Sequence, residues 1–462
     1  MNSSLLETLL KCPFCGGQFN GTGTDGVSGR MEYGILSCYC SRFPVVAGIP
    51  VLKREKASEK AIPLIEDGRY LDALLTLIQP GSIPMPPMRK LASCLPFGSR
   101  LRDLAQQKML QEWRERMSAL LLRVDQGERV TVCELLDCYF SNKEHYNYFA
   151  FRFGQPRYLV ALSFVSLIRQ PKKMILDLGC GQGHITRSLV HQAKDRRVIG
   201  VDRSFWSLYV AKRWVAPEGE YVCCSADHAL PFADKVFSAV FSSDAFHYIV
   251  NKRACVQELN RITDEPIIIL TWLHNKLLRV PHDGVPLPPE GYQALFSDVP
   301  HRIMADEDIL DRYLRKEGPN LSTQAETAFL SQKLLLSIVA ATPRDVFCDY
   351  GPFVEAHHAK GRLGINPLYE IQVVECEIGK ICLRRRFLSR PYEEDHAEYK
   401  NYMPEKVELD SSILRDIAGG KRTPAIEKLI EQFIVLGIPD NFYSDPQPAS
   451  VVSAYDAVSN NA

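Results

Sequence analysis

The stretch that most constrains the fold is "MILDLGCGQGHITRSL", residues 174–189. It begins as an apolar run interrupted by one aspartate, which is typical of a buried strand, and three closely spaced glycines then lead into a segment with helical character. Glycine lets the backbone adopt conformations that other residues disfavour, and it lets a ligand approach the chain closely. The stretch therefore predicts a strand, a ligand-binding bend and the start of a helix.

Four more apolar runs of strand length follow: "RVIGVD", "EYVCCSAD", "FSAVFSSD" and "EPIIILTWL". Helix-compatible segments separate most of these runs. Alternation of strands and helices is the signature of a parallel sheet with helices on both faces. We therefore expect an α/β fold over this part of the chain.

The bend departs from two common phosphate-binding patterns. The dinucleotide fingerprint needs a third glycine where this chain has His184, and no Gly-Lys-Ser/Thr follows as in a P-loop. Instead, the bend resembles motif I of class I S-adenosylmethionine (SAM)-dependent methyltransferases. "VIGVD", "SADHALPF", "FSAVFSSDAFHYI" and "VQELNRI" resemble the later motifs of that family in order, the third of them as in the subgroup that includes quinone-biosynthesis enzymes. The resemblance covers about residues 145–275 and implies a Rossmann-like seven-stranded sheet.

This resemblance also implies SAM as the cofactor and assigns residues to it. Asp177 would act on the methionine ammonium, Asp202 would accept hydrogen bonds from the ribose hydroxyls, and Asp227 would accept one from the adenine amino group. Arg152, in an aromatic segment before the first strand, would reach the SAM carboxylate or simply pack among the aromatic rings. The predicted cofactor-binding set is Asp177, Gly179, Cys180, Gly181, Gly183, Asp202, Asp227, His228, Ser243 and Arg152.

Four cysteines lie close together near the N-terminus, namely Cys12, Cys15, Cys38 and Cys40. Paired thiolates on glycine-flanked turns suit a tetrahedral structural zinc ion, and no histidine lies in the first 56 residues. The segment resembles the zinc-ribbon module that accompanies many methyltransferases as a partner or a fused domain, so a protein partner could dock there. The second pair is C-x-C rather than C-x-x-C, and a ribbon that has lost its zinc is the alternative.

Candidate catalytic residues follow the fourth and fifth predicted strands, because open parallel sheets bind ligands at the carboxyl ends of their strands. They are Asp244, His247 and His274, and each histidine could instead be a packing residue. His357 and His358 are further candidates that could simply be exposed. The fourth-strand segment reads "SSDAF" and lacks the Asn/Asp-Pro-Pro-aromatic motif of enzymes that methylate the exocyclic amines of bases.

The sequence divides into six predicted parts. They are a zinc-ribbon-like module (1–56), a helical connector (57–140), a SAM-binding core (141–275), a lid over the substrate (276–366), a hairpin completing the sheet (367–390) and a C-terminal extension (391–462). The lid segment contains "STQAETAFLSQKLLLSIVAAT", which is interpreted as a helix.

Composition narrows the function. Lys plus Arg and Asp plus Glu both number 55, and this neutral balance disfavours nucleic acid as the main partner. No secretion signal or membrane-length apolar run is evident, and the scattered cysteines suit a reducing cytoplasm. We therefore expect a cytoplasmic enzyme that methylates oxygen or nitrogen of a small-molecule acceptor by in-line displacement. An RNA methyltransferase and a SAM-binding scaffold without activity are the alternatives.

Overall fold

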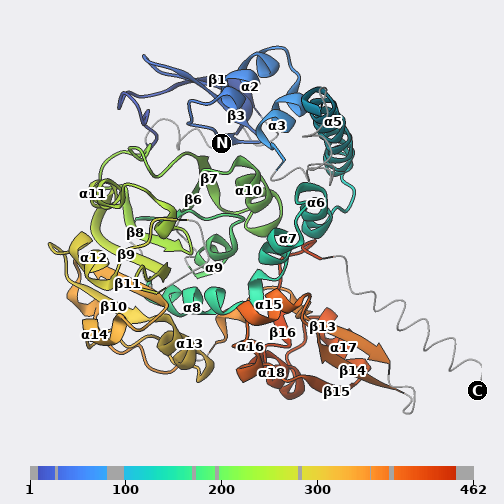
Figure 1. The fold of residues 1–462 in the computed structure, drawn as a ribbon, viewed down its shortest axis with the longest axis vertical. Coiled ribbons are helices and arrows are strands. Elements are labelled where there is room, and N and C mark those ends of the chain that lie inside the picture. The colour runs from blue at the N-terminus through green and yellow to red at the C-terminus, as the bar shows by residue number, and fades with distance from the viewer. Residues whose placement is uncertain are drawn as a thin grey trace, which may run out of the picture. The chain divides into compact units, whose positions relative to one another are not determined.

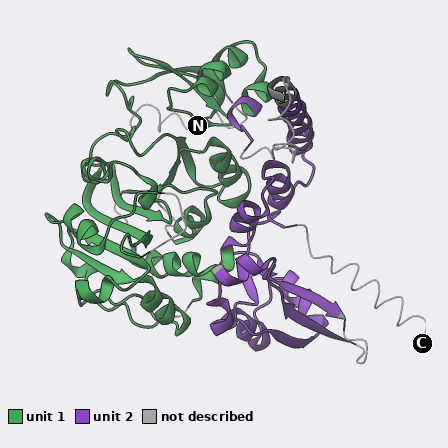
Figure 2. Ribbon diagram, viewed as in Figure 1, with its two compact units in different colours: residues 1–74, 153–360 green, residues 75–152, 361–462 purple. Residues whose placement is uncertain are grey.

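The computed structural model describes residues 9–25, 30–80, 98–168, 173–192, 197–278, 284–353, 355–373 and 379–443. Two compact units emerge, each built from two stretches of chain (Figure 2). The first unit comprises Met1–Leu74 and Phe153–Lys360, and the second comprises Leu75–Arg152 and Gly361–Ala462. None of the described helices combines the length and apolarity needed to cross a membrane.

A seven-stranded sheet forms the centre of the first unit (Figure 1). Its strands are β5 (Met174–Leu178), β6 (Val198–Asp202), β7 (Glu220–Cys223), β8 (Phe237–Ser243), β9 (Thr263–His274), β10 (His301–Ala305) and β11 (Leu335–Ala341). The order is β10-β11-β9-β8-β5-β6-β7, and β5 to β9 run parallel. The expected seven-stranded α/β sheet is confirmed. Its strand order reverses between β5 and β8, which is where such sheets bind ligands.

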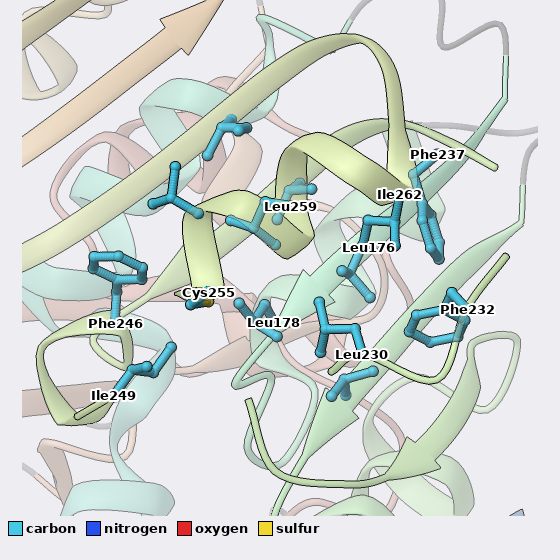
Figure 3. Packing of buried hydrophobic residues seen from close by; sticks show 14 of the residues in the cluster. Leu176, Leu178, Leu230, Phe232, Phe237, Phe246, Ile249, Cys255, Leu259 and Ile262 are labelled. Atoms are coloured by element: carbon cyan, nitrogen blue, oxygen red, sulfur yellow. The ribbon is translucent and has the colours of Figure 1, made fainter. Parts of the chain in front are cut away.

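Helices cover the sheet in two groups. One consists of α8 (Pro156–Val165), α9 (His184–Gln192), α10 (Phe205–Val210), the π-helical turn η2 (Ala211–Val215) and α13 (Asp306–Leu314), joined by contacts of α8 with α9 and α13. The other consists of α11 (Lys252–Ile262), α12 (Pro289–Leu295) and α14 (Thr327–Leu330). Figure 3 shows Leu176 and Leu178 of β5 among Cys255, Leu259 and Ile262 of α11. Because these two leucines are two residues apart in a strand, they point to the same face.

The N-terminal module is a four-stranded antiparallel sheet of β1 (Asn20–Asp25), β2 (Met31–Ser37), β3 (Arg42–Val46) and β4 (Ile49–Pro50). It lies against the edge of the central sheet, where Val51 bridges to Cys223 and the Leu52 amide donates to the Cys223 carbonyl at 2.8 Å. The module's Leu10 and Phe43 belong to the same buried cluster as β5 and α11. Edge strand β7 is therefore paired rather than open, which removes a template for aggregation.

Two predictions about the C-terminal half were wrong. The 368–388 hairpin forms as β13 (Tyr369–Val373) and β14 (Lys380–Arg385), but it pairs with β15 (Lys406–Asp410) in a separate sheet of the second unit. Strands β10 and β11, both from the predicted lid, complete the central sheet instead. The residues 335–341 were interpreted as helical, but the whole run past Leu335 is buried, as in a strand covered on both faces. A short apolar run fits both patterns, since periodicity cannot separate them.

The second unit contains most of the predicted connector (57–140) and the whole predicted C-terminal extension (391–462). These two segments therefore belong largely to one compact unit and are not separate domains. Its elements are the end of α3 (Tyr70–Leu77), α5 (Gly98–Asp125), α6 (Val132–Tyr139), α7 (Lys143–Ala150), β12 (Leu363–Ile365), α15 (Arg390–Asp395), α16 (Tyr399–Tyr402), α17 (Ser412–Ala418), α18 (Pro424–Glu431) and β16 (Val435–Gly437), together with β13 to β15. The amide of Val132 donates to the Asn441 carbonyl at 2.9 Å. The remaining helix of the connector, α2 (Lys56–Glu66), belongs to the first unit.

Candidate cofactor and catalytic site

The glycine-rich bend after β5 is held in one conformation by its neighbours. The amides of Gly179 and Cys180 both donate to the Val201 carbonyl at the end of β6, at 2.7 and 3.0 Å. Gly179, Gly181 and Gly183 all have positive φ, at 70°, 53° and 79°. This is the left-handed region, which glycine enters without the cost that a side chain imposes. The bend therefore needs glycine at all three positions.

Two of these glycines also permit close approaches. A Cβ atom on Gly179 would lie 2.4 Å from the Cβ of Ala245, which follows β8, and one on Gly183 would lie 2.9 Å from the Cβ of Ala211. At Gly181, by contrast, an added Cβ would meet no atom of the described residues within 4 Å. The bend thus contacts the end of β8 on one side and leaves room for a ligand over Gly181.

Asp202, the last residue of β6, braces the bend. Its Oδ2 accepts a hydrogen bond from the Gly181 amide at 2.9 Å, and its Oδ1 accepts one from the Ser204 amide at 2.7 Å. Burial raises the pKa of this carboxyl above its usual range, although the two amides oppose the shift. Each carboxylate oxygen has a second lone pair, so Asp202 can still accept hydrogen bonds from a ligand's hydroxyl groups.

Asp177 is buried in β5, and its Oδ2 accepts a hydrogen bond from the Thr186 hydroxyl at 2.6 Å. Burial raises the pKa of its carboxyl to about 7, because removal from water disfavours the charged form. A cationic group at this end of the strand would favour the ionised carboxylate. The position and chemistry of Asp177 therefore fit the ammonium of an amino-acid ligand.

The remaining predicted cofactor residues differ in their surroundings. Asp227 and His228 are exposed after β7, and Asp227 Oδ1 accepts the Val250 amide at 2.8 Å. Cys180 is buried, which raises the pKa of its thiol well above the usual value. Ser243 ends β8, and its buried hydroxyl has no hydrogen-bond partner among the described residues. Arg152 belongs to the second unit, where its guanidinium lies 4.9 Å from the Tyr148 ring centroid.

Gln182, between two glycines of the bend, was not predicted as a site residue. Its side chain is buried, and neither amide atom has a hydrogen-bond partner within the described part of the chain. An unsatisfied buried amide costs free energy, so such a group in a ligand-binding bend indicates that a ligand or water completes it. No sequence pattern separates this glutamine from an ordinary loop residue.

The three predicted catalytic residues come together at the carboxyl ends of β8 and β9. All are buried, and one ligand-forming atom from each of Asp244, His247 and His274 lies within 4.8 Å of the others. We call them the buried trio. The two imidazole rings have centroids 4.2 Å apart at 32°. Asp244 directly precedes Ala245, the residue in contact with the glycine bend, so the trio adjoins the candidate cofactor site.

The carboxylate of the trio has a cationic partner. Arg157 Nη1, from α8, lies 3.0 Å from Asp244 Oδ2, and both side chains are largely buried. The Arg157 guanidinium also lies 5.5 Å from the centroid of the Trp272 ring. Both Asp244 and Trp272 have positive φ, at 56° and 59°. Non-glycine residues in this region are uncommon and cluster at functional sites.

The backbone beside each histidine is fixed by buried polar groups. The Lys252 ammonium donates to the carbonyls of His247, Ile249 and Val285 at 3.2, 2.6 and 2.7 Å, and its burial lowers its pKa to about 8. At the second histidine, the Tyr292 hydroxyl donates to the His274 carbonyl at 3.1 Å.

Asn275, directly after His274, continues this support. Its Nδ2 donates to the carbonyls of Leu330, Ser331 and Lys333 at 3.2, 3.3 and 2.9 Å. Lys252, Tyr292 and Asn275 were missed in the sequence because they act through backbone carbonyls, and no motif marks that role.

The other two candidate histidines lie outside the buried trio. His358 is buried, and its Nδ1 lies 3.0 Å from the Tyr313 hydroxyl. Burial lowers the pKa of His357 to about 4. The expectation that this pair could simply be exposed was therefore wrong.

The four N-terminal cysteines converge as predicted. Sulfur–sulfur distances are 3.6 Å for Cys12–Cys40, 3.8 Å for Cys15–Cys38 and 3.6 Å for Cys38–Cys40. Four thiolates bound to one tetrahedral zinc at about 2.3 Å would lie about 3.8 Å apart. The donor set and spacing are therefore compatible with zinc, and the C-x-C pair does not prevent the convergence.

Comparisons with known proteins address the segment that carries the bend. Residues 176–265 match a family model described as a methyltransferase domain. Over 91 residues, the chain is 32% identical to malonyl-[acyl-carrier protein] O-methyltransferase of Legionella pneumophila, covering 20% of this chain and 32% of that protein. It is also 32% identical over 92 residues to demethylmenaquinone methyltransferase of Thermotoga maritima, covering 20% and 39%.

These matches span only about a third of the length of the curated relatives. Among solved structures, the YcgJ protein from Bacillus subtilis aligns with 18% identity and a TM-score of 0.29, covering 40% of this chain and 97% of that one.

Proposed function

We propose that this chain, whose residues 176–265 form a class I methyltransferase domain, transfers a methyl group from SAM to an oxygen or nitrogen atom of a small molecule. The observation that carries the proposal is the close approach between Gly179 and Ala245. It places the buried trio directly beside the glycine bend. A bound sulfonium and a group that activates the acceptor would therefore be neighbours.

The residues of the bend fit the parts of SAM. Space over Gly181 admits the ligand, Asp202 offers oxygens to hydroxyl groups, and Asp177 offers a carboxylate to an ammonium. The amide of Gln182 and the hydroxyl of Ser243, which have no hydrogen-bond partner in the described part of the chain, supply further polar groups. SAM supplies an electrophilic methyl group on a positively charged sulfur, and the chain's own task is to hold it and orient the acceptor.

The trio supplies the chemistry at the acceptor. Carboxylate and imidazole groups promote loss of a proton from a hydroxyl or ammonium acceptor. The acceptor's lone pair then forms a bond to the methyl carbon as the sulfur–carbon bond breaks, and neutral S-adenosylhomocysteine leaves. Holding the two reactants in line supplies much of the rate enhancement, since it replaces a bimolecular encounter.

We assign the small acceptor to a hollow of about 660 Å³ that is lined by neighbours of His247 and not by the trio itself. Its lining includes Lys252, Gly284 and Val285, and a Cβ on Gly284 would lie 3.3 Å from the His247 ring. Pockets of this size class are typical of small-molecule sites.

The basic run at 380–390 supports RNA as the acceptor less than its positively charged sequence suggests. Lys380 pairs with Asp410 at 3.2 Å, Arg386 pairs with Glu370, and Arg385 donates to the Met403 carbonyl. Each of these cations is engaged within the second unit. Since phosphate contacts carry most nucleic-acid affinity, the run offers less positive charge than its sequence suggests.

A transfer assay tests the proposal. The purified protein is incubated with methyl-labelled SAM and a metabolite extract, beside the variants His274→Gln and Asp67→Ala. We expect label in a small-molecule fraction, at least a tenfold loss in His274→Gln and none in Asp67→Ala, whose side chain is exposed on the surface. Label that appears only in an added RNA fraction would show that the acceptor is RNA and not a small molecule. If a protein that binds SAM transfers label to no fraction, the proposal is overturned.

A further inference from the structure

The buried trio has the composition of a metal site. It offers one carboxylate and two imidazoles, and three or four such ligands are common around zinc and related ions. Neighbouring donor atoms bound to one ion at about 2.0–2.2 Å lie about 2.8–3.6 Å apart, by octahedral or tetrahedral geometry. The trio's donors already lie within 4.8 Å of one another. Small side-chain rotations would therefore bring all three onto one ion.

We propose that Asp244, His247 and His274 bind a divalent transition-metal ion, separate from the cysteine cluster. The two sites lie in different segments of the chain and have different ligand types, and no residue is shared between them. Three protein ligands leave at least one coordination position open, as in catalytic zinc sites, whereas four cysteines leave none.

Fixed supports around the ligands favour this role. Ligating residues generally need neighbours that orient them, and here the carbonyl of each histidine accepts a buried hydrogen bond, from Lys252 and from Tyr292. The Arg157 guanidinium, 3.0 Å from Asp244 Oδ2, orients this carboxylate. The positive φ of Asp244 fixes that residue in a conformation that its neighbours must maintain.

Charge near the trio is compatible with a cation. Asp306 is buried at the start of α13 and close enough to Asp244 for the two carboxyls to repel each other. Asp306 Oδ1 accepts the Ser337 hydroxyl at 2.5 Å. The buried cations Arg157 and Lys252 also lie beside the trio, so the Asp306 carboxyl partly offsets their charge.

Because the trio lies beside the glycine bend, an ion bound there would activate the methyl acceptor; this step rests on the proposed function. With an ion bound, the trio would act on the acceptor through the ion and not as a base itself. An acceptor hydroxyl bound at the open position would lose its proton to solvent more readily, because a metal ion stabilises the alkoxide. The alkoxide oxygen would then bond to the methyl carbon of SAM while the sulfur–carbon bond breaks. The products are a methyl ether, S-adenosylhomocysteine and one proton.

Cobalt titration of the full chain tests the metal site without any methyl acceptor. Metal-free protein and the double variant Cys12→Ser/Cys15→Ser are titrated with Co²⁺, with bound metal counted by mass spectrometry and coordination followed by absorbance. We expect the cysteine variant to retain one ion per chain without a sulfur-to-cobalt charge-transfer band. Adding His247→Gln and His274→Gln in that background should abolish binding, whereas His145→Gln, at an exposed histidine of the second unit, should leave it intact.

The outcomes separate this inference from the proposed function. A cysteine variant that binds no Co²⁺, yet is folded by circular dichroism and binds SAM, would overturn the metal site and leave the methyltransferase proposal standing. Retained Co²⁺ binding that the histidine variants do not reduce would also overturn it. A bound ion lost in those variants, in a protein that transfers no methyl group, would support the site and contradict the function.

Discussion

At the scale of single residues, the site depends on backbone positions that only glycine fills without strain. Gly179 combines a positive φ with a contact that an added Cβ would make at 2.4 Å. Gly68 has nearly the same φ, 71°, but an added Cβ there would meet nothing within 4 Å. Comparing alanine substitutions at Gly179 and Gly68 therefore separates the free-energy cost of the backbone conformation from that of the steric clash.

We predict that Gly179→Ala costs more than Gly68→Ala. Both variants pay about 1–2 kcal/mol for a side chain in the left-handed region. Only Gly179→Ala must also push the bend away from Ala245, so its SAM affinity should fall at least tenfold while that of Gly68→Ala is unchanged. Thermal melts and SAM titrations of both variants check this, and equal SAM affinities would contradict the role of the close approach.

Asp177 predicts a pH dependence of stability in the absence of ligand. Its folded pKa is about 7, above the ordinary value of 3.8, so its contribution to stability is complete below pH 3.8 and is lost as pH rises to 7. Asp177→Asn removes this dependence. The variant should therefore gain stability relative to wild type between about pH 4 and 7, by up to about 1.4 kcal/mol per pH unit, and the difference should level off above pH 7.

Urea unfolding at several pH values measures this difference, with Asp67→Asn as the control at an exposed aspartate. The control should follow wild type at every pH. A constant offset between Asp177→Asn and wild type across the range would show that the carboxyl is not perturbed in the folded protein.

The sequence predicted the trio's members because each follows a parallel strand, and parallel strands end at one edge of a sheet. It did not predict their supports. Arg157 pairs with Asp244, which lies 87 residues later in the sequence, and Lys252 donates hydrogen bonds to three backbone carbonyls. Such contacts depend on how helices lie on the sheet, which local patterns do not encode.

At the scale of elements, the five parallel strands were predictable and the last two were not. The runs from β5 to β9 are apolar, bounded by polar turns and separated by helices, so their type and order could be read directly. Strand β11 follows the four-residue helix α14 without a strong turn signal, which let the two merge into one expected helix. The hairpin at 368–388 has a genuine strand pattern, but local pattern does not specify which sheet it joins.

The pairing of the N-terminal module with β7 predicts a local effect of the cysteine cluster. Cys12→Ser/Cys15→Ser should loosen the module and so expose the amides of β7. We expect faster hydrogen exchange at residues 220–223 and unchanged exchange in β10 at the opposite edge.

Cys348→Ser is the matched control, since this exposed cysteine lies in the same unit outside the cluster. It should leave exchange unchanged throughout the sheet. Equal protection of β7 in wild type and the double variant would show that the cluster does not maintain the pairing.

At the scale of the whole molecule, the chain combines a segment that matches a methyltransferase-domain family model with two further parts. One is the cysteine-rich module, whose strands lie against the sheet within the first unit and which therefore acts as part of that unit. The other is a second unit assembled from the predicted connector and extension. From the sequence alone, the connector and the extension were predicted as separate parts. Contacts such as that of Val132 with Asn441 join residues that are too far apart in the sequence for any local pattern to reveal.

The central claim, that the bend between β5 and α9 binds SAM for methyl transfer, is tested most directly by calorimetric titration with SAM and S-adenosylhomocysteine. Wild type is compared with Asp202→Ala, which loses the brace on Gly181, and with Asp67→Ala at an exposed position. We predict micromolar binding of both ligands to wild type and Asp67→Ala, and its loss in a folded Asp202→Ala variant. A folded wild-type protein that binds neither ligand would contradict the account.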